Sequence, residues 1–188
     1  MQELFFTSDT HFNHDREFIF RPRGFETIQE HDEAIITNWN HIVGPHDIVY
    51  HLGDFMMGQD IDYGIECMRR LNGEIYFIIG NHDTTHRLEA LAELPNVTIE
   101  GHAVVIGAGG YRFFACHYPV ISTPLGEGSN LKHTLLNCHG HTHNKSQFYN
   151  ENPTMINVGL DAWRNYPVHW ETMIAEANKQ LEECYNFC

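Results

Sequence analysis

The chain has 188 residues, with 11 Lys and Arg against 25 Asp and Glu, so its formal net charge is −14 at pH 7. A hydrophobic content of 42% argues against a disordered chain, and no apolar run is long enough to cross a membrane. The length fits one domain over residues 1–188. The first residues do not resemble a signal peptide, and five scattered cysteines suggest reduced thiols, so we expect a cytoplasmic protein.

Strand and helix patterns alternate in the first half of the chain. Five segments carry them: strands at 4–7, 48–52 and 74–79, and helices at 28–42 and 61–71. Thr27 is a suitable N-cap for the first of these helices, and Gly44-Pro45 ends it. This order predicts parallel strands joined by right-handed crossovers.

The second half is mostly strand-like. Short apolar runs separated by Gly, Pro and Asn predict strands at 97–106, 111–115, 135–138 and 155–158. The glycine-rich residues 107–110 indicate a hairpin tip rather than a phosphate-binding loop, because no helix follows them. Apolar residues at helical spacing predict a closing helix over 170–184.

Five polar clusters end predicted strands. They are Asp9-x-His11, Gly53-Asp54, Gly80-Asn81-His82-Asp83, Cys116-His117 and His139-Gly140-His141-Thr142-His143. Open α/β sheets bind their ligands at the carboxyl ends of the strands, so these clusters should meet in one crevice. The chain also contains 15 histidines, several times ordinary usage, and histidine is both a common metal ligand and an acid or base near neutral pH.

The clusters offer more metal donors than one ion requires. Two carboxylates, one amide and four imidazoles are available: Asp9, Asp54, Asn81, His11, His117, His141 and His143. This set exceeds one tetrahedral zinc site and suits two divalent ions that share a carboxylate, for which we choose Asp54. Nitrogen and oxygen donors without thiolate suit Mn²⁺, Fe, Zn²⁺ or Ni²⁺. Such a centre would attract phosphate even in an acidic protein, because nearby ions dominate the local field.

In this order, the clusters resemble the motifs of the calcineurin-like metallophosphoesterases: D-x-H, G-D, G-N-H-D/E, H and G-H-x-H. The resemblance covers residues 9–143 and implies an α/β (α+β) fold, a four-layer αββα sandwich of two mixed β-sheets flanked by helices. It also implies two ligand sets: Asp9, His11, Asp54 and His143 for one ion, and Asp54, Asn81, His117 and His141 for the other.

The resemblance also implies a mechanism. A metal-bridging hydroxide attacks phosphorus in line, while His82, oriented by Asp83, stabilises the phosphoryl oxygens or protonates the leaving group. The chain bears a closer resemblance to small single-domain bacterial and phage members, because they share S-D-T-H-F with a following His, here residues 8–12 and His14, and N-V-x-x-D-x-W, here residues 157–163.

Other residues near the motifs allow more than one interpretation. His14 is a candidate second-shell or substrate contact, and Arg21 and Arg23 are either phosphate-binding groups at the mouth of the site or solvated loop residues. Asp161 and Trp163 are expected to fix a turn near the metals. The glycine-rich residues 126–130 could form a mobile rim over the site.

These patterns favour a dinuclear-metal-dependent phosphoesterase, either a phosphodiesterase or a broad phosphatase, acting on a small phosphate ester. One alternative is a non-catalytic metal-binding scaffold, but such proteins usually lose ligands or the histidine that corresponds to His82. Another is a nuclease acting on single strands or ends. It should show a basic track, and 11 dispersed Lys and Arg give little sign of one, so general nucleic-acid binding is not expected.

Overall fold

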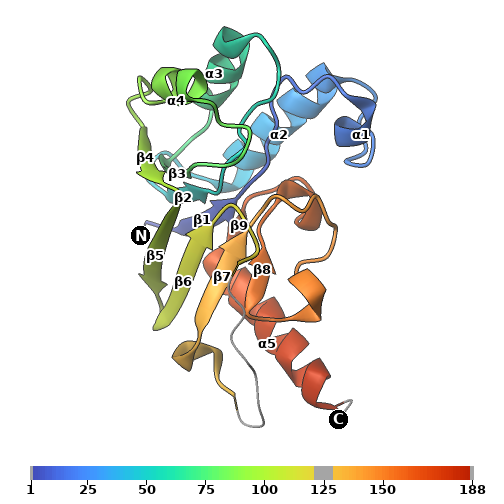
Figure 1. The fold of residues 1–188 in the computed structure, drawn as a ribbon, viewed down its shortest axis with the longest axis vertical. Helices are drawn as coiled ribbons and strands as arrows, with labels where there is room; N and C mark the ends of the chain where they lie inside the picture. The colour runs from blue at the N-terminus through green and yellow to red at the C-terminus, as the bar shows by residue number, and fades with distance from the viewer. Residues whose placement is uncertain (1, 121–128, 187–188) are drawn as a thin grey trace.

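A computed structural model describes residues 2–120 and 129–186, which form two mixed β-sheets with flanking helices (Figure 1). The first sheet has the order β4-β3-β2-β1-β9. Its strands are β1 (Leu4–Thr7), β2 (Ile48–His51), β3 (Glu74–Ile78), β4 (Val97–Gly101) and β9 (Val168–His169). Strands β1 to β4 are parallel, whereas β9 pairs antiparallel with β1. The carboxyl ends of β1, β2 and β3 therefore meet at one edge.

The second sheet has the order β5-β6-β7-β8. Its strands are β5 (Ala103–Ala108), β6 (Tyr111–Cys116), β7 (Leu135–His139) and β8 (Met155–Asn157). Strands β5 and β6 form an antiparallel hairpin, while β6, β7 and β8 are parallel to one another. Because β6 and β7 run in the same direction, the polar clusters that follow them also lie at a common edge.

The helices are α1 (Glu17–Phe20), α2 (Ile28–Ile42), α3 (Ile61–Arg69), α4 (Thr85–Leu91) and α5 (Trp170–Asn186), with short 3₁₀ turns at Leu131–His133, Tyr149–Glu151 and Leu160–Ala162. Helices α2, α3 and α4 gather beside the first sheet, and α5 lies at the other end of the molecule, near the second sheet (Figure 1). None of the helices in the described ranges is long and apolar enough to cross a membrane.

The alternation of side chains along β1 separates two hydrophobic cores. Phe5 packs with the residues of α2, α3 and α4, including Trp39 and Met68. Its neighbour Phe6 points to the opposite face and packs with the second sheet and α5, including Phe113 and Met173. The first sheet is therefore covered on both faces, and its polar loops are left at the strand ends.

Several predicted elements are confirmed. Helix α2 covers Ile28–Ile42, and the side-chain oxygen of Thr27 accepts a hydrogen bond from the backbone N–H of Glu30 at 3.2 Å, as an N-cap does. The hairpin at 107–110 is present between β5 and β6. The pair of mixed sheets with flanking helices is the arrangement that the motifs implied.

One predicted strand is wrong. The run 97–106 divides at His102 into β4, which belongs to the first sheet, and β5, which belongs to the second. Gly101 has φ of +91°, a conformation that glycine adopts without a Cβ penalty, and the chain leaves the first sheet there. Helix α4 and the short strand β9 were not predicted from the residue patterns. Of the proposed mobile rim, residues 126–128 lie outside the described ranges.

Candidate metal centre

Most of the predicted ligands lie on strained loops, at the ends of β1, β2 and β7. Five of the seven have positive φ: Asp9 at 60°, His11 at 50°, Asp54 at 59°, His141 at 67° and His143 at 48°. A residue other than glycine in this conformation costs about 1–3 kcal/mol, and such residues persist only where the surrounding structure fixes them. The strain concentrates at the predicted site, which indicates that the fold holds these side chains for a function.

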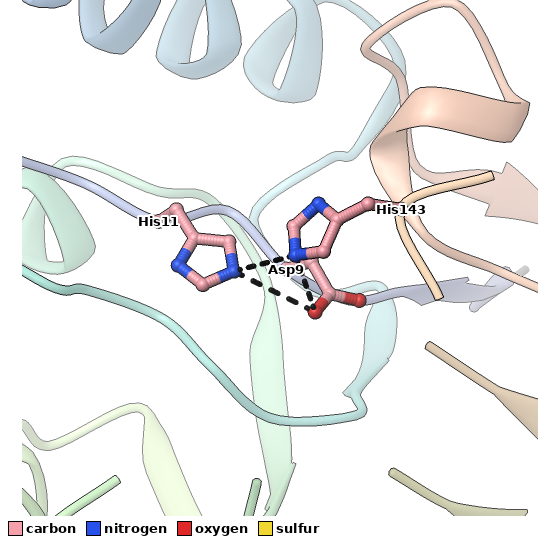
Figure 2. Close-up of side chains that lie close together, drawn as sticks. All are labelled: Asp9, His11 and His143. Carbon is pink, nitrogen blue, oxygen red and sulfur yellow. Dashed lines mark hydrogen bonds and ion pairs between the residues drawn. The ribbon is translucent and has the colours of Figure 1, made fainter. Parts of the chain in front are cut away.

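A first cluster consists of Asp9, His11 and His143, whose ligand atoms lie close enough to share a cation (Figure 2). Asp9 Oδ1 lies 3.7 Å from His11 Nε2 and 3.7 Å from His143 Nε2, and the two nitrogens are 3.1 Å apart. Asp9 Oδ2 accepts from the backbone N–H of His141 at 2.9 Å, but buried Oδ1 finds no hydrogen-bond donor among the described residues. A cation at this point would satisfy an oxygen that is otherwise costly to bury.

A second cluster consists of Asp9, Asp54 and His117. Asp54 Oδ2 lies 3.4 Å from His117 Nε2 and 3.9 Å from His11 Nε2, so it faces a histidine of each cluster. His117 Nδ1 lies 2.7 Å from the carbonyl oxygen of Leu52, which can only accept, so Nδ1 carries a proton and Nε2 is turned toward Asp54. Such fixing of the far ring nitrogen is typical of metal-binding histidines.

Asn81 and His141 complete the arrangement. Asn81 Oδ1 lies 2.8 Å from His117 Nε2 and 2.8 Å from His141 Nδ1. The structure therefore brings together all seven side chains that the sequence suggested as ligands, although they come from five separate loops. This set of carboxylate, amide and imidazole donors fits one or more divalent cations.

The electrostatics of the site keep both aspartates ionised. Burial raises the pKa of Asp9, but the imidazoles of His11, His143 and His117 outweigh it and bring the pKa well below its usual range. Burial likewise opposes ionisation of Asp54, and its contact with His117 outweighs it. Burial lowers the pKa of His117, but Asp54 and Asp9 raise it to about 9 overall. A bound cation would compete with that proton for Nε2.

His82 lies beside the clusters, with its side chain 37% exposed. Its backbone N–H donates to Asp54 Oδ1 at 2.8 Å, and its Nε2 lies 4.0 Å from Asp54 Oδ2. Its ring centroid is 5.8 Å from that of His11. The imidazole therefore lies beside the centre and is partly exposed to solvent.

The expectation that Asp83 orients the imidazole of His82 is corrected by the structure. The carboxylate of Asp83 instead accepts three backbone N–H groups, from Gly80 at 2.7 Å, Asp54 at 2.7 Å and Phe55 at 3.3 Å. Burial raises the pKa of Asp83 to about 6, although these donors oppose the shift. Asp83 thus ties the loop after β2 to the loop after β3.

Arg87 in α4 is a site residue that the sequence analysis missed. Its guanidinium donates to four carbonyl oxygens: His82 at 2.7 Å, Met56 at 3.1 Å, Met57 at 3.1 Å and Gly58 at 2.9 Å. These bonds fix the loop that carries His82 against the loop after β2. The only signal in the sequence is a position five residues after His82, and that position alone does not identify such a role.

The three candidate substrate contacts have different environments. His14 is half-buried with its ring centroid 5.2 Å from that of His11, and it lines a cavity of about 600 Å³ together with residues 13–16 and 57–60. Burial and the neighbouring histidines lower its pKa to about 4. Arg21 pairs with Glu17 and Glu26 on the surface. The structure does not bring Arg21 into the clusters.

Arg23 is not at the mouth of the site. Its side chain is 1% exposed, and its guanidinium donates to Asp161 Oδ2 at 2.8 Å and to the carbonyl oxygen of Asp9 at 2.8 Å. The phosphate-binding interpretation is corrected, because buried acceptors already occupy these donors. Asp161 in turn lies 3.2 Å from His143 Nδ1, which agrees with the expected turn near the metals.

Gly140 is required at its position because a side chain there would occupy the centre. A Cβ atom on Gly140 would overlap Ser8 Oγ and Asp9 Oδ2. We expect Gly140→Ala to lower the free energy of unfolding by about 1–3 kcal/mol, as overpacking does, and to weaken metal binding by Asp9. Denaturant unfolding and metal titration measure both effects. Gly107→Ala is the control, since its nearest contact would be Tyr111 O at 3.9 Å. Equal free energies of unfolding and equal metal affinities in the two variants would contradict the prediction.

Known proteins resemble this chain over most of its length. An uncharacterized protein of Methanocaldococcus jannaschii is 30% identical over 177 residues, which cover 93% of this chain and 90% of that protein. The Gene 66 protein of Mycobacterium phage L5 is 27% identical over 184 residues, covering 87% and 88% of the two chains.

A solved structure of a protein of unknown function from Aquifex aeolicus shares the fold, with a TM-score of 0.66 at 23% identity over 94% of this chain and 99% of that one. The sequence pattern of the calcineurin-like phosphoesterases matches residues 3–183. On this evidence, the chain belongs to the calcineurin-like phosphoesterase family.

Proposed function

We propose that the protein hydrolyses phosphate esters at a centre of two divalent ions. The observation that carries this proposal is the meeting of five donor side chains in two clusters that share Asp9, with Asn81 and His141 beside them. Asp54 Oδ2 faces His11 of one cluster and His117 of the other. A centre for a single ion would leave several of these seven donors without a role.

We assign the ligands as follows. The first ion is held by Asp9, His11, His143 and Asp54, and the second by Asp54, Asn81, His117 and His141. The bridging role of Asp54 is supported by its place between His11 and His117. When bound, the ions would supply positive charge to the phosphoryl oxygens and lower the pKa of a water nucleophile. Mn²⁺, Fe, Zn²⁺ and Ni²⁺ all suit these donors.

His82 serves as the proton donor to the leaving group in this proposal, or as a hydrogen-bond donor to the phosphoryl oxygens. Its side chain is partly exposed beside the centre, and histidine exchanges protons near pH 7. The backbone N–H bond to Asp54 and the Arg87 bond to the His82 carbonyl fix the loop, so the imidazole needs little reorganisation to act.

The substrate is a small or accessible phosphate ester, either a diester or a monoester. The cavity of about 600 Å³ beside His14 adjoins the first cluster through the contact between His14 and His11. We infer that it receives the alcohol part of the ester while the phosphate lies at the clusters. The polar lining, which includes Asn13 and Gln59, suits a leaving group with hydroxyl or amide functions.

The test is hydrolysis of paired chromogenic phosphate monoester and diester substrates. Protein stripped of metal and then reloaded separately with Mn²⁺, Fe²⁺, Zn²⁺, Ni²⁺ or Mg²⁺ should regain turnover, and the ratio of diester to monoester rates should define the substrate class. Two bound ions without hydrolysis of either substrate or of a nucleotide panel would contradict the proposal and favour a metal-binding scaffold.

A further inference from the structure

A connected series of polar groups, most of them buried, extends from His143 of the first cluster to the loop that follows β1. Its members are His143, Asp161, Arg23, His31, Asp32 and the backbone N–H of Asn13. The Arg23 and Asp161 side chains are 1% and 8% exposed, and those of His31 and Asp32 are fully buried. Burying so many charged or polar groups is costly unless each is paired, so the series calls for a functional reason.

Arg23 is the centre of this series. Its Nε and Nη2 donate to the two oxygens of Asp161 at 3.0 and 2.8 Å, a bidentate pair. Nη2 also donates to the carbonyl oxygen of Asp9, and Nη1 to His31 Nε2, at 2.8 and 2.9 Å. The guanidinium therefore joins Asp161, which contacts the predicted ligand His143, to the backbone of the predicted ligand Asp9.

The hydrogen-bond directions determine the form of His31. Because Arg23 can only donate, His31 Nε2 accepts and its proton lies on Nδ1. Nδ1 then donates to Asp32 Oδ1 at 2.7 Å. The second oxygen of Asp32 accepts the backbone N–H of Asn13 at 2.9 Å, so helix α2 is joined to the loop that follows β1.

Both ends of the series reach residues with strained backbones. At one end, Asp161 Oδ2 lies 3.2 Å from His143 Nδ1, which directs Nε2 toward Asp9 and His11. At the other end, the series holds the loop in which Asp9, His11 and Asn13 have φ of 60°, 50° and 59°. The strain of this loop needs such external support.

The second cluster is held differently. His117 is oriented by the carbonyl oxygen of Leu52, and the loop of Asp54 by the carboxylate of Asp83. No member of the Arg23 series contacts His117 or Asp54 among the described residues. His117 and Asp54 are therefore held by groups outside the Arg23 series, although the two clusters share Asp9.

We propose that Arg23 is a positioning residue for the first ion only: through Asp161 it orients His143, and through the Asp9 carbonyl and the His31–Asp32 pair it holds the loop of Asp9 and His11. This inference rests on the proposed function. Outer residues that orient metal ligands typically change metal affinity by about 10- to 100-fold when they are replaced.

The test compares Arg23→Met with Arg21→Met, a nearby exposed arginine that pairs with Glu17 and Glu26. Metal-free proteins are titrated with Mn²⁺ by calorimetry, and spin coupling between neighbouring Mn²⁺ ions is followed by electron paramagnetic resonance. We expect Arg23→Met to lower the affinity for one ion by about 10- to 100-fold and to leave the affinity for the other within about twofold of the wild type. The spin coupling between the two ions should be lost. Arg21→Met should match the wild type.

Two further variants assign the site and keep the test decisive. In a His117→Ala background, the ligands of the first ion stay intact. Arg23→Met should therefore still lower the affinity for that ion. Arg23→Met alone leaves the buried carboxylate of Asp161 with its contact to His143 but without its bidentate partner. Arg23→Met with Asp161→Asn is therefore prepared in case the single variant does not fold. It should show the same weakening, because the bonds to Asp9 and His31 are still lost.

The outcomes separate this inference from the proposed function. Two ions bound with wild-type affinity by a folded Arg23→Met protein, or by the double variant, would overturn the positioning role and leave the dinuclear centre intact. A single ion bound by the wild type, and weakened by Arg23→Met, would contradict the dinuclear centre but support the positioning role.

Discussion

Asp54→Asn is expected to abolish phosphoester hydrolysis and to weaken the binding of both ions. The backbone N–H of His82 donates to Asp54 Oδ1 at 2.8 Å, so an asparagine here would place its oxygen at that position. Its amide nitrogen would then replace Oδ2 and direct N–H groups toward His11 and His117, which lie 3.9 and 3.4 Å from Oδ2. An uncharged group that donates hydrogen bonds cannot bind cations there.

Calorimetric titration with Mn²⁺ and turnover of the paired ester substrates measure this effect. Asp9→Asn tests the choice of bridge, because Asp9 also has a ligand atom in both clusters. If Asp54 is the bridge, Asp9→Asn should lower the affinity for the first ion much more than the affinity for the second. Asp62→Asn, an exposed residue in the first turn of α3, is the control and should behave as the wild type. Two tightly bound ions in Asp54→Asn would refute the bridge.

His82→Ala should reduce turnover by about two to four orders of magnitude while both ions stay bound. This corresponds to a loss of about 3 to 5 kcal/mol of transition-state stabilisation. The two effects separate because the backbone of residue 82, which an alanine retains, donates to Asp54 and accepts from Arg87. The alanine removes only the partly exposed imidazole and leaves the bond to Asp54 in place.

Steady-state kinetics and Mn²⁺ titration of the same preparation check this prediction. His86→Ala is the matched control: His86 lies in α4, its side chain is 80% exposed, and it pairs with the exposed Glu89. We expect His86→Ala to leave both turnover and metal affinity unchanged. A wild-type rate in His82→Ala would remove His82 from the mechanism, and loss of an ion would show that it binds metal.

The residue patterns predicted those parts of the fold that depend on local chemistry. Helix α2 follows from the spacing of its apolar residues and from the Thr27 cap, both of which act within a few residues. The parallel order of β1, β2 and β3 follows from the alternation of strands with helices, since short crossovers permit few arrangements. The seven donors could be expected to meet because each follows a strand.

The patterns failed where a residue's partner is distant along the chain. Strand β9 has two residues, and only its pairing with β1 defines it. Arg23 was suggested as a phosphate-binding residue because it lies in a polar loop near the first motif, yet its acceptor Asp161 is 138 residues away. The same limit applies to Asp83, which accepts backbone N–H groups from the loop after β2 rather than binding its neighbour His82.

The sequence by itself determined which residue types the centre contains and at which strand ends they lie, because strand periodicity and motif spacing are local properties. The tertiary structure decided which donors face each other, which loops carry strain, and which charged residues support the centre from behind. Those facts depend on long-range packing: Gly140 must be a glycine because Ser8 and Asp9 fill the space beside it, and Arg23 is buried because Asp161, His31 and the Asp9 carbonyl surround its guanidinium.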